Sequence, residues 1–292
     1  MTAHHRSASN ESLKTMNPAQ RALWYIESHL AEPMTLDEIA AIGGVSRFHM
    51  VRAFAAATGY PVMRYVRARR LSEAAHSLAK GAPDILSVAL EADYGSHEAF
   101  TRAFRDQFGT TPEAVRAATC THQLKLQEPI LMDSTISDDL KAPRFETAKA
   151  FLVAGIAERI SCDNGAIIPG MWARLHQEVA DIPERNGNVA YGVCCNGDDS
   201  GNFDYIAGVE VGDFSNLARR FGRIRIPEQR YAVFTHTDHV ASIRRTVSAI
   251  WNRWLPASSY KAADAPNFER YDEKFDPVSG NGGFEIWVPV KE

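Results

Sequence analysis

Residues 96–112 read SHEAFTRAFRDQFGTTP, and a weaker copy of this stretch begins fifty positions earlier in the chain. An internal repeat of about fifty residues usually means that one supersecondary unit is used twice. The serine that starts each copy can accept hydrogen bonds from the free N–H groups of a first helical turn, and the glycine near its end favours a left-handed stop. Each copy therefore predicts the second helix of a helix-turn-helix unit. The recurring positions are Ser46, Arg52, Ala53, Phe54 and Gly59, then Ser96, Arg102, Ala103, Phe104 and Gly109.

The apolar residues of these two helices recur every four positions, which stacks them on one core-facing stripe. Arg52 and Arg102 lie two positions from the nearest stripe residue, so they point well away from it. An arginine on such a helix can bond a guanine edge or a phosphate. The alternative is an amphipathic helical hairpin with solvated arginines, and two copies in register argue against it. The stripe residues are Met50, Phe54, Phe100, Phe104 and Phe108.

The composition is that of a soluble globular protein with room for two domains. The chain has 292 residues, of which 45% are hydrophobic and 23% are charged, both ordinary values for such proteins. No apolar run approaches the length of a membrane span, and the first residues lack the apolar block of a signal peptide. We therefore expect a cytoplasmic protein with no membrane partner.

The net charge of −4 is mildly acidic, which is unusual for a protein that binds DNA. Phosphate attraction depends on clustering more than on the total charge. A cluster of arginines follows the first repeat, and we expect it to face outward and serve this attraction. With so little excess charge, nonspecific binding should be modest, so affinity should depend on well-placed contacts. The clustered residues are Arg64, Arg67, Arg69 and Arg70.

The four cysteines predict neither a disulfide framework nor a zinc site. Cys194 and Cys195 are adjacent, so in a strand they face opposite sides, whereas Cys120 and Cys162 stand alone. These spacings favour ordinary thiols in a reducing compartment. We expect no metal and no cofactor.

Capping residues and helix breakers organise residues 18–120, after a polar start at 1–17 that we expect to be disordered. Thr35 begins a helix, and Glu38 three residues later completes a capping box. Residues 61–80 read as one long helix with apolar residues inward and arginines outward. The prediction is an all-α N-terminal domain, in which a long helix joins two helix-turn-helix units.

The end of the second unit resembles the AraC/XylS-type transcription regulators. The match rests on the F-x-R-x-F run at 100–104, followed by Gly109 and Thr111-Pro112. This resemblance covers about residues 17–120 and implies binding to double-stranded promoter or operator DNA. The small excess of positive charge separately makes RNA polymerase a candidate partner on which affinity would depend. The DNA-facing positions that it implies are Arg47, Phe48, Val51 and Arg52 in the first unit and His97, Glu98, Thr101 and Arg102 in the second.

The sequence changes character after residue 120. Residues 121–143 are polar and poorly periodic, which predicts a linker, part of it an ordered strand. Residues 144–292 then show a strand, a helix and two strands, and the same order a second time. This pattern predicts an α+β domain of duplicated β-α-β-β units. Two helices should cover one face of its antiparallel sheet, leaving the other face free to form a groove.

This second half resembles the GyrI-like effector-binding domains. The resemblance covers about residues 144–292 and rests on an early helix tryptophan, Trp172, the phrase FERY at 268–271 and the ending FEIWVPV at 284–290. A sensor domain that follows the DNA-reading domain resembles the Rob-type branch of AraC regulators. The resemblance implies a small-molecule effector as a partner.

Strand alternation in the last hairpin predicts where the effector binds. Glu269 and Tyr271 share one face of their strand, and Glu285 and Trp287 share one face of theirs. A carboxylate among aromatic rings favours a lipophilic cation, and the resemblance implies such ligands with a glutamate in the pocket. Glu269 is the first choice for this glutamate and Glu285 the second. The candidate walls are Trp172, Tyr191, Tyr205, Tyr271 and Trp287.

Structural roles compete with these assignments, because Glu285 could be an exposed strand residue and Trp172 core filling. Three functions remain open for the whole chain. The favoured one is a transcription regulator that responds to a ligand and is not an enzyme. The second makes the C-terminal domain a hydrolase, with Glu269 as general base beside Tyr191. The third makes it a protein-interaction module.

Overall fold

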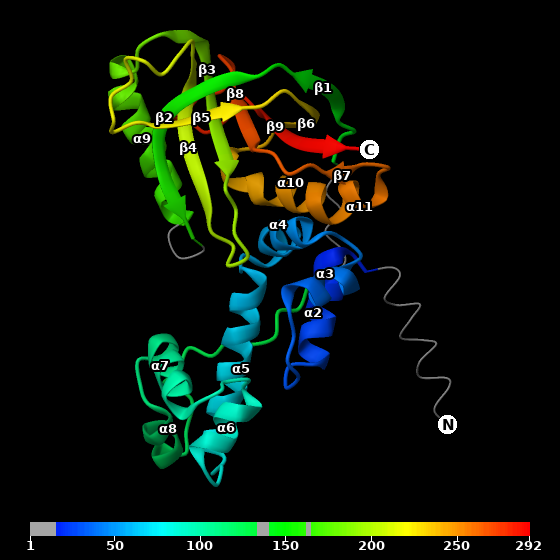
Figure 1. Cartoon of the computed structure of the whole chain (residues 1–292), viewed down its shortest axis with the longest axis vertical. Coiled ribbons are helices and arrows are strands. Elements are labelled where there is room, and N and C mark those ends of the chain that lie inside the picture. The colour runs from blue at the N-terminus through cyan, green and yellow to red at the C-terminus, as the bar shows by residue number, and fades with distance from the viewer. Residues whose placement is uncertain (1–15, 133–139, 162–164) are drawn as a thin grey trace. The chain divides into compact units, whose positions relative to one another are not determined.

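The computed structural model describes residues 16–132, 140–161 and 165–292 (Figure 1). The chain divides into two compact units. Residues up to Met50 and from Tyr60 to Ser134 form the first, called here the helical unit, while residues 51–59 and 135–292 form the second, called the sheet unit. The predicted disorder of residues 1–17 falls almost entirely outside the described residues, as does Cys162.

The helical unit is built of short helices around one long helix, as predicted. Helix α4 is shared, because its second half belongs to the sheet unit. The helices are α2 (Pro18–Ser28), α3 (Leu36–Gly43), α4 (Arg47–Thr58), α5 (Val62–Ala79), α6 (Ile85–Glu91), α7 (His97–Phe108) and α8 (Pro112–Ala118).

Local capping explains why these helices begin and end where they do. Thr35 accepts from the Glu38 N–H, while the Glu38 carboxylate accepts from the Thr35 N–H, which confirms the predicted capping box. The Ser96 hydroxyl accepts from the Ala99 N–H at the start of α7, and Gly109 ends that helix with φ at 68°. Glycine adopts such a left-handed conformation without steric cost.

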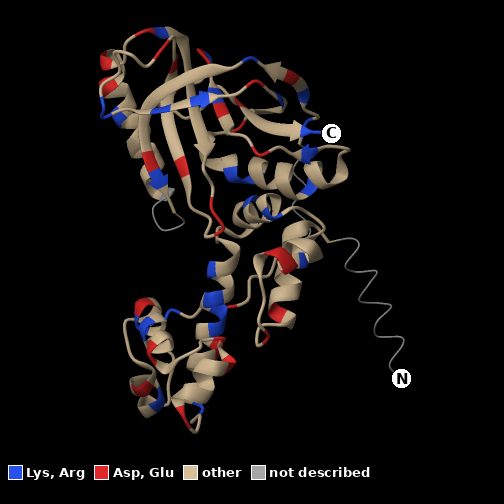
Figure 2. Cartoon of the chain, viewed as in Figure 1, with Lys and Arg blue, Asp and Glu red and all other residues tan. Residues whose placement is uncertain are grey.

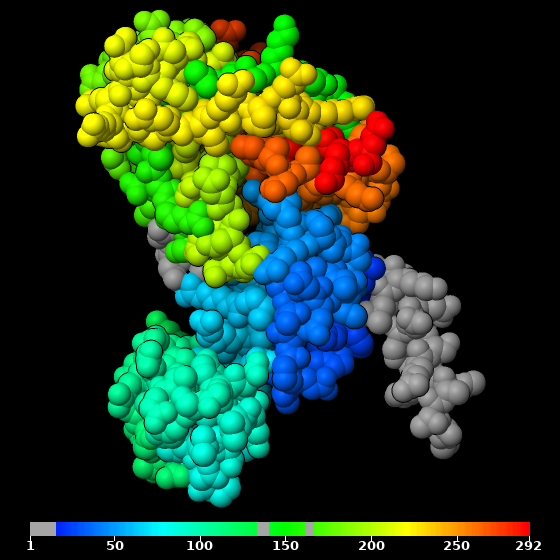
Figure 3. Space-filling view, viewed as in Figure 1, coloured from blue at the N-terminus to red at the C-terminus, as the bar shows by residue number. Residues whose placement is uncertain are grey.

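The predicted stripe of phenylalanines forms the core beneath the second helix-turn-helix unit. Phe100 and Phe104 are completely buried, and their ring centroids lie 5.5 Å apart. They pack against α5 residues such as Leu71 and Leu78. Figure 3 shows the residues of α6 to α8, in cyan to green, as one compact mass. The aromatic stripe therefore fixes the side of α7 that turns outward.

Two of the four clustered arginines are buried, so the prediction that all four face outward is wrong. The Arg69 guanidinium donates to both Glu27 oxygens and to Glu73, all at 3.0–3.2 Å. Arg70 pairs with Asp93 at 2.5 Å and donates to the Leu30 carbonyl. Glu27, Asp93 and Leu30 lie far away in sequence from the arginines that they bind, which is why helical spacing alone missed this burial. Figure 2 shows the basic residues along α5.

The predicted linker begins as an ordered segment of the helical unit. Leu124 and Leu126 pack against the core around α5. The Gln127 N–H donates to the Ser72 hydroxyl at 2.8 Å, and the Ile130 N–H donates to the Tyr65 hydroxyl at 3.1 Å. Residues 133–139 of the predicted linker lie outside the described residues. The segment up to residue 130 therefore packs along α5, and it is called here the strap.

The sheet unit contains an antiparallel sheet with strand order β1-β6-β9-β8-β3-β4-β2-β5, and β7 pairs with β9 (Figure 1). Pro227 lies between β5 and β6. The duplication of a β-α-β-β unit stays a prediction. The strands are β1 (Arg144–Ala148), β2 (Phe151–Ile160), β3 (Arg185–Cys195), β4 (Phe203–Val211), β5 (Gly222–Ile226), β6 (Gln229–His236), β7 (Lys261–Ala262), β8 (Asn267–Tyr271) and β9 (Phe284–Lys291).

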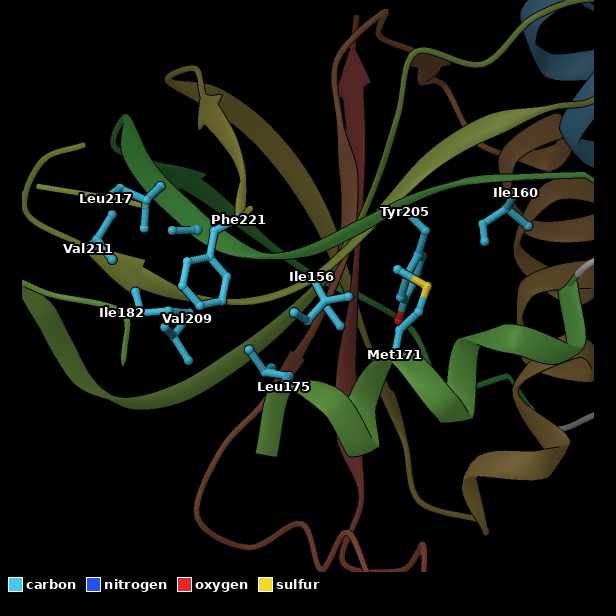
Figure 4. Close-up of a cluster of buried hydrophobic side chains, with 12 residues drawn as sticks. Ile156, Ile160, Met171, Leu175, Ile182, Tyr205, Val209, Val211, Leu217 and Phe221 are labelled. Carbon is cyan, nitrogen blue, oxygen red and sulfur yellow. The ribbon is translucent and has the colours of Figure 1, made fainter. Parts of the chain in front are cut away.

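Two helical segments pack on one face of this sheet, as predicted. Helix α9 (Ile168–Glu178) places Met171 and Leu175 against the strands, and Figure 4 shows Met171 beside Tyr205. Helix α10 (Ile243–Ala249) continues into the π-helix η4 (Ile250–Trp254). These two segments pack on β6 through a Thr246–His236 hydrogen bond and a Trp254–Phe234 ring contact.

The opposite face of the sheet carries a second apolar core, so the predicted open groove there is wrong. Alternate strand residues turn to this side, and they include side chains of β2, β3, β6, β8 and β9. Residue alternation along single strands could not predict this second core, because the curvature of the whole sheet decides what covers its second face. The fully packed members are Val153, Tyr191, Val193, Ile206, Ile226, Tyr231, Val233, Phe268 and Trp287.

Candidate effector site and DNA-reading helices

Glu269 occupies the middle of β8, on the face that the helices cover. Its Oε2 accepts a hydrogen bond from the Tyr205 hydroxyl at 2.9 Å and another from the Tyr271 hydroxyl at 3.0 Å. Tyr205 comes from β4, whereas Tyr271 is two residues along β8, where alternation returns the side chain to the same face. The structure thus brings together three residues that the sequence singled out.

Gly192 makes room for this carboxylate. It pairs with Glu269 across β3 and β8, directly beneath the site. A Cβ atom at position 192 would collide with both Glu269 Oε2 and the Tyr205 hydroxyl. Glycine is the residue that permits so close an approach. Sequence reasoning missed Gly192, since nothing local distinguishes it from any other strand glycine.

Aromatic rings surround the carboxylate. Trp172 of α9 donates its indole N–H to the Tyr205 hydroxyl at 3.1 Å, and its ring meets Tyr271 edge-on with centroids 5.0 Å apart. Tyr271 also contacts Phe275 and Phe284, each with centroids 4.7 Å apart. The sequence analysis missed both phenylalanines. Alternation along β9 could have found Phe284, because it shares a face with Ile286, the cross-strand partner of Glu269.

Burial controls the protonation of this cluster. It raises the pKa of Glu269 to about 7, although the hydrogen bonds from Tyr205 and Tyr271 oppose the rise. Burial and then the nearby Glu269 charge raise the pKa of the Tyr205 and Tyr271 hydroxyls well above their usual range, so both remain donors. Desolvation of a carboxylate disfavours its charged form unless a cation or more hydrogen bonds compensate. Glu269 is therefore close to half ionised near pH 7.

Glu285 does not join this site, which corrects the second choice for the glutamate. It pairs with Arg270 across β8 and β9, on the opposite face from Glu269. Its carboxylate accepts from Arg144 at 2.7 Å, from Arg270 at 3.5 Å and from the Trp287 indole at 3.0 Å. Two arginines already neutralise this charge, so no ligand cation is needed there.

Tyr191 and Trp287 also lie on the opposite face, in the second apolar core. The Tyr191 hydroxyl donates to Glu210 at 3.3 Å rather than to Glu269. The predicted walls Tyr191 and Trp287 are therefore wrong for a pocket around Glu269, whereas Trp172, Tyr205 and Tyr271 do surround it. The same geometry removes the pairing of Glu269 with Tyr191 that a hydrolase was expected to use.

The second DNA-reading helix presents its predicted residues together. His97, Glu98, Thr101 and Arg102 line one surface hollow, along with Arg105 and Asp106. The ring of His97 lies 3.3 Å from the Glu113 carboxylate of α8. Since the phenylalanine stripe holds the other side of α7 in the core, this hollow is the outward side of the helix. Base or phosphate contact by these residues stays a prediction.

The residues predicted on the first DNA-reading helix have different surroundings. Arg47 is exposed and pairs with Asp37 of α3 at 3.1 Å. Arg52 lies over the Trp251 ring of the sheet unit, with 5.5 Å from its guanidinium carbon to the ring centroid. Phe48 and Val51 are partly exposed. Sequence reasoning missed the role of Trp251, which no repeat or motif marks.

No group of histidine, cysteine or acidic residues that could hold a metal occurs in the part of the chain that the structure describes. Among the described helices, none is long and apolar enough to cross a membrane. Cys120, Cys194 and Cys195 are free thiols.

Both halves of the chain match known proteins. Residues 141–291, more than half of the chain, match the family of the GyrI-like small molecule binding domain, and residues 39–118 match a helix-turn-helix domain family. The right origin-binding protein of Escherichia coli is 25% identical over 285 residues, covering 92% of this chain and 96% of that protein. The transcriptional regulator BrlR of Pseudomonas aeruginosa is 27% identical over 209 residues, 66% of this chain and 77% of BrlR.

A more distant likeness concerns the sheet unit. The structure of the protein SAV2435 bound to tetraphenylphosphonium is 22% identical, the match covers 52% of this chain and 94% of that chain, and the TM-score is 0.44. The matches of the two halves agree with the paired helix-turn-helix units and with the antiparallel sheet. The chain belongs to the AraC-type transcription regulators in which a helix-turn-helix DNA-binding domain is followed by a GyrI-like effector-binding domain.

Proposed function

We propose that this regulator senses a lipophilic cation, which binds beside Glu269 in the sheet unit. The observation that carries the proposal is a single carboxylate whose pKa burial raises to about 7, held by two tyrosine hydroxyls among aromatic rings. The ligand would offset the desolvation of the carboxylate with its charge and place its apolar body against the rings. The effector residues in this proposal are Glu269, Trp172, Tyr205 and Tyr271, with Phe275 and Phe284 added.

The site suits a cation more than an anion or a neutral molecule. The hydroxyls of Tyr205 and Tyr271 both donate to Glu269 Oε2, so they hold in place an oxygen that is negative when the carboxyl group is ionised. Aromatic faces carry negative charge density and attract cations as well. Glu269 is partly exposed, which leaves it accessible to a ligand. These three features act in the same direction.

The same proposal assigns DNA reading to the outward residues of α4 and α7. Residues 18–120 form the DNA-binding domain, residues 121–143 the connection and residues 144–292 the effector domain, in a cytoplasmic regulator that performs no catalysis. RNA polymerase would be the third partner, recruited at the promoter. Arg102 supports this assignment, because it is exposed in the hollow on α7.

Binding of tetraphenylphosphonium to the full chain tests the proposal, with tryptophan fluorescence as the signal because Trp172 contacts the site. Glu269→Gln should abolish saturable binding. Glu285→Gln is the matched control on the opposite face, and it should leave binding unchanged. The cation should be recovered intact, since turnover would favour the hydrolase instead. Equal binding by wild type and Glu269→Gln would refute the assignment.

A further inference from the structure

Helix α4, the first helix proposed to read DNA, also packs within the sheet unit. Residues 51–58 of this helix belong to that unit. The Asn252 side-chain amide donates to the backbone carbonyl of Ala53 at 2.8 Å. Asn252 is only 4% exposed. A buried amide that hydrogen-bonds a helix carbonyl marks a built contact, since leaving such a group without a partner is costly.

Arg52 extends this contact. Its guanidinium lies over the ring of Trp251, whose side chain is 2% exposed. A guanidinium over an indole face gains a cation–π attraction, which is strongest with tryptophan. Burial also lowers the pKa of Arg52, and the neighbouring Cys194, Cys195 and Asp264 oppose that change. Arg52 is therefore held among groups of the sheet unit.

The surface that holds α4 has unusual backbone structure. Trp251 and Asn252 are consecutive residues of the π-helix η4. In a π-helix each turn contains more residues than in an α-helix, and such segments are rare and concentrate at functional sites. Here both residues contact α4, Trp251 through its ring and Asn252 through its side-chain amide.

We propose that the Trp251–Asn252 surface is a docking site for α4, and that docking and DNA compete for Arg52. The guanidinium cannot stack on Trp251 and at the same time bond a guanine edge in a major groove. DNA binding by α4 must therefore release this contact. The inference rests on the proposed DNA reading by α4, and it adds that the effector domain restrains that helix.

DNA affinity of the full chain tests the docking site, with a duplex selected from a random library by the wild-type protein. Asn252→Ala removes the hydrogen bond to Ala53 and should bind this duplex about fivefold more tightly, as expected for the loss of one restraining hydrogen bond. Arg253→Ala is the control, because Arg253 is an exposed residue of the same π-helix. It should change affinity less than Asn252→Ala.

Hydrogen exchange of the wild-type chain gives a second measurement that does not depend on how the variant folds. Adding DNA should increase hydrogen exchange in residues 243–257, because α4 no longer covers them once it binds DNA. Unchanged exchange there, or Asn252→Ala binding no tighter than wild type while folded, would overturn the docking site. Arg52→Ala separates the two ideas when the selected duplex is compared with a scrambled one, because the loss of docking changes both affinities equally. An unchanged preference for the selected duplex contradicts DNA reading by α4, whereas the exchange result concerns docking alone.

Discussion

The hydroxyl of Tyr205 donates to Glu269 Oε2 at 2.9 Å, and the same hydroxyl accepts from the Trp172 indole. Tyr205 thereby connects α9 to the carboxylate on β8. A hydrogen bond to the charged form of an acid lowers its pKa, and the bond from Tyr205 does so here against the larger effect of burial. Tyr205 therefore tunes the pH at which Glu269 becomes a carboxylate.

Cation affinity should depend on pH through Glu269. With a pKa of about 7, the carboxyl group is mostly protonated at pH 6 and mostly ionised at pH 8. Since the cation pairs with the ionised form, affinity should rise about tenfold between these pH values. Tyr205→Phe should move the midpoint of this rise to higher pH, because the lost hydrogen bond favoured the charged form.

Calorimetric titration with tetraphenylphosphonium at a series of pH values measures this midpoint. Tyr191→Phe is the matched control, because its hydroxyl bonds Glu210 on the opposite face. Its midpoint should stay at the wild-type value. A midpoint that Tyr205→Phe leaves in place would contradict the tuning role of this hydroxyl.

Gly192→Ala should remove cation binding without adding or deleting a charge. The new methyl group would occupy the space of Glu269 Oε2 and the Tyr205 hydroxyl, so both side chains must shift. Gly170→Ala is a control on α9, where a methyl group meets open space and alanine favours the helix. Fluorescence titration should show binding in Gly170→Ala only. Full binding by Gly192→Ala would mean that the carboxylate position is not critical.

Arg69→Ala should destabilise the helical unit by about 3–5 kcal/mol, since it leaves the half-buried Glu27 without its positively charged partner. Arg69 has 5% of its side chain exposed, against 25% for Glu27. It also donates to the Gln127 carbonyl at 2.9 Å, so the strap along α5 should loosen. Urea unfolding followed by circular dichroism measures the loss. Arg67→Ala, at an exposed position of the same helix, should cost less than about 0.5 kcal/mol.

Arg102→Ala should weaken specific DNA binding by roughly 1–3 kcal/mol if the side chain forks onto a base. Lys80→Ala removes the same charge at the exposed end of α5, away from the hollow on α7, and should have a smaller effect. Fluorescence anisotropy on the selected duplex and on a scrambled one separates base contact from phosphate contact. Equal losses on both duplexes would indicate a phosphate contact.

Features set by neighbouring residues could be predicted from the sequence. The capping box at Thr35 and Glu38 and the stop at Gly109 depend on a few adjacent positions, and the structure confirms both. The phenylalanine stripe of α7 depends only on helical spacing. Helical spacing gave the wrong orientation for Arg69 and Arg70, because their partners Glu27 and Asp93 lie far away in the sequence.

In the candidate site, too, local relations could be predicted from the sequence and long-range ones could not. Alternation along β8 placed Glu269 with Tyr271, which is a local relation and is present in the structure. Whether Glu269 faces the same side as Glu285 depends on the register between β8 and β9, which pairs Arg270 with Glu285. This register places Glu269 in the site and Glu285 on the opposite face, where arginines hold it. A shift of one position would put both carboxylates on the same face. Sequence alone contained no signal for that register.

The central claim is that the Glu269 charge selects a lipophilic cation. Tetraphenylphosphonium and tetraphenylborate have the same shape and opposite charge, so calorimetric titration of the full chain with each ion isolates the role of charge. Wild type should bind the phosphonium at least tenfold more tightly than the borate at pH 8, and Glu269→Gln should lose this preference. A preference that survives in Glu269→Gln, or tighter binding of the borate by wild type, would contradict it.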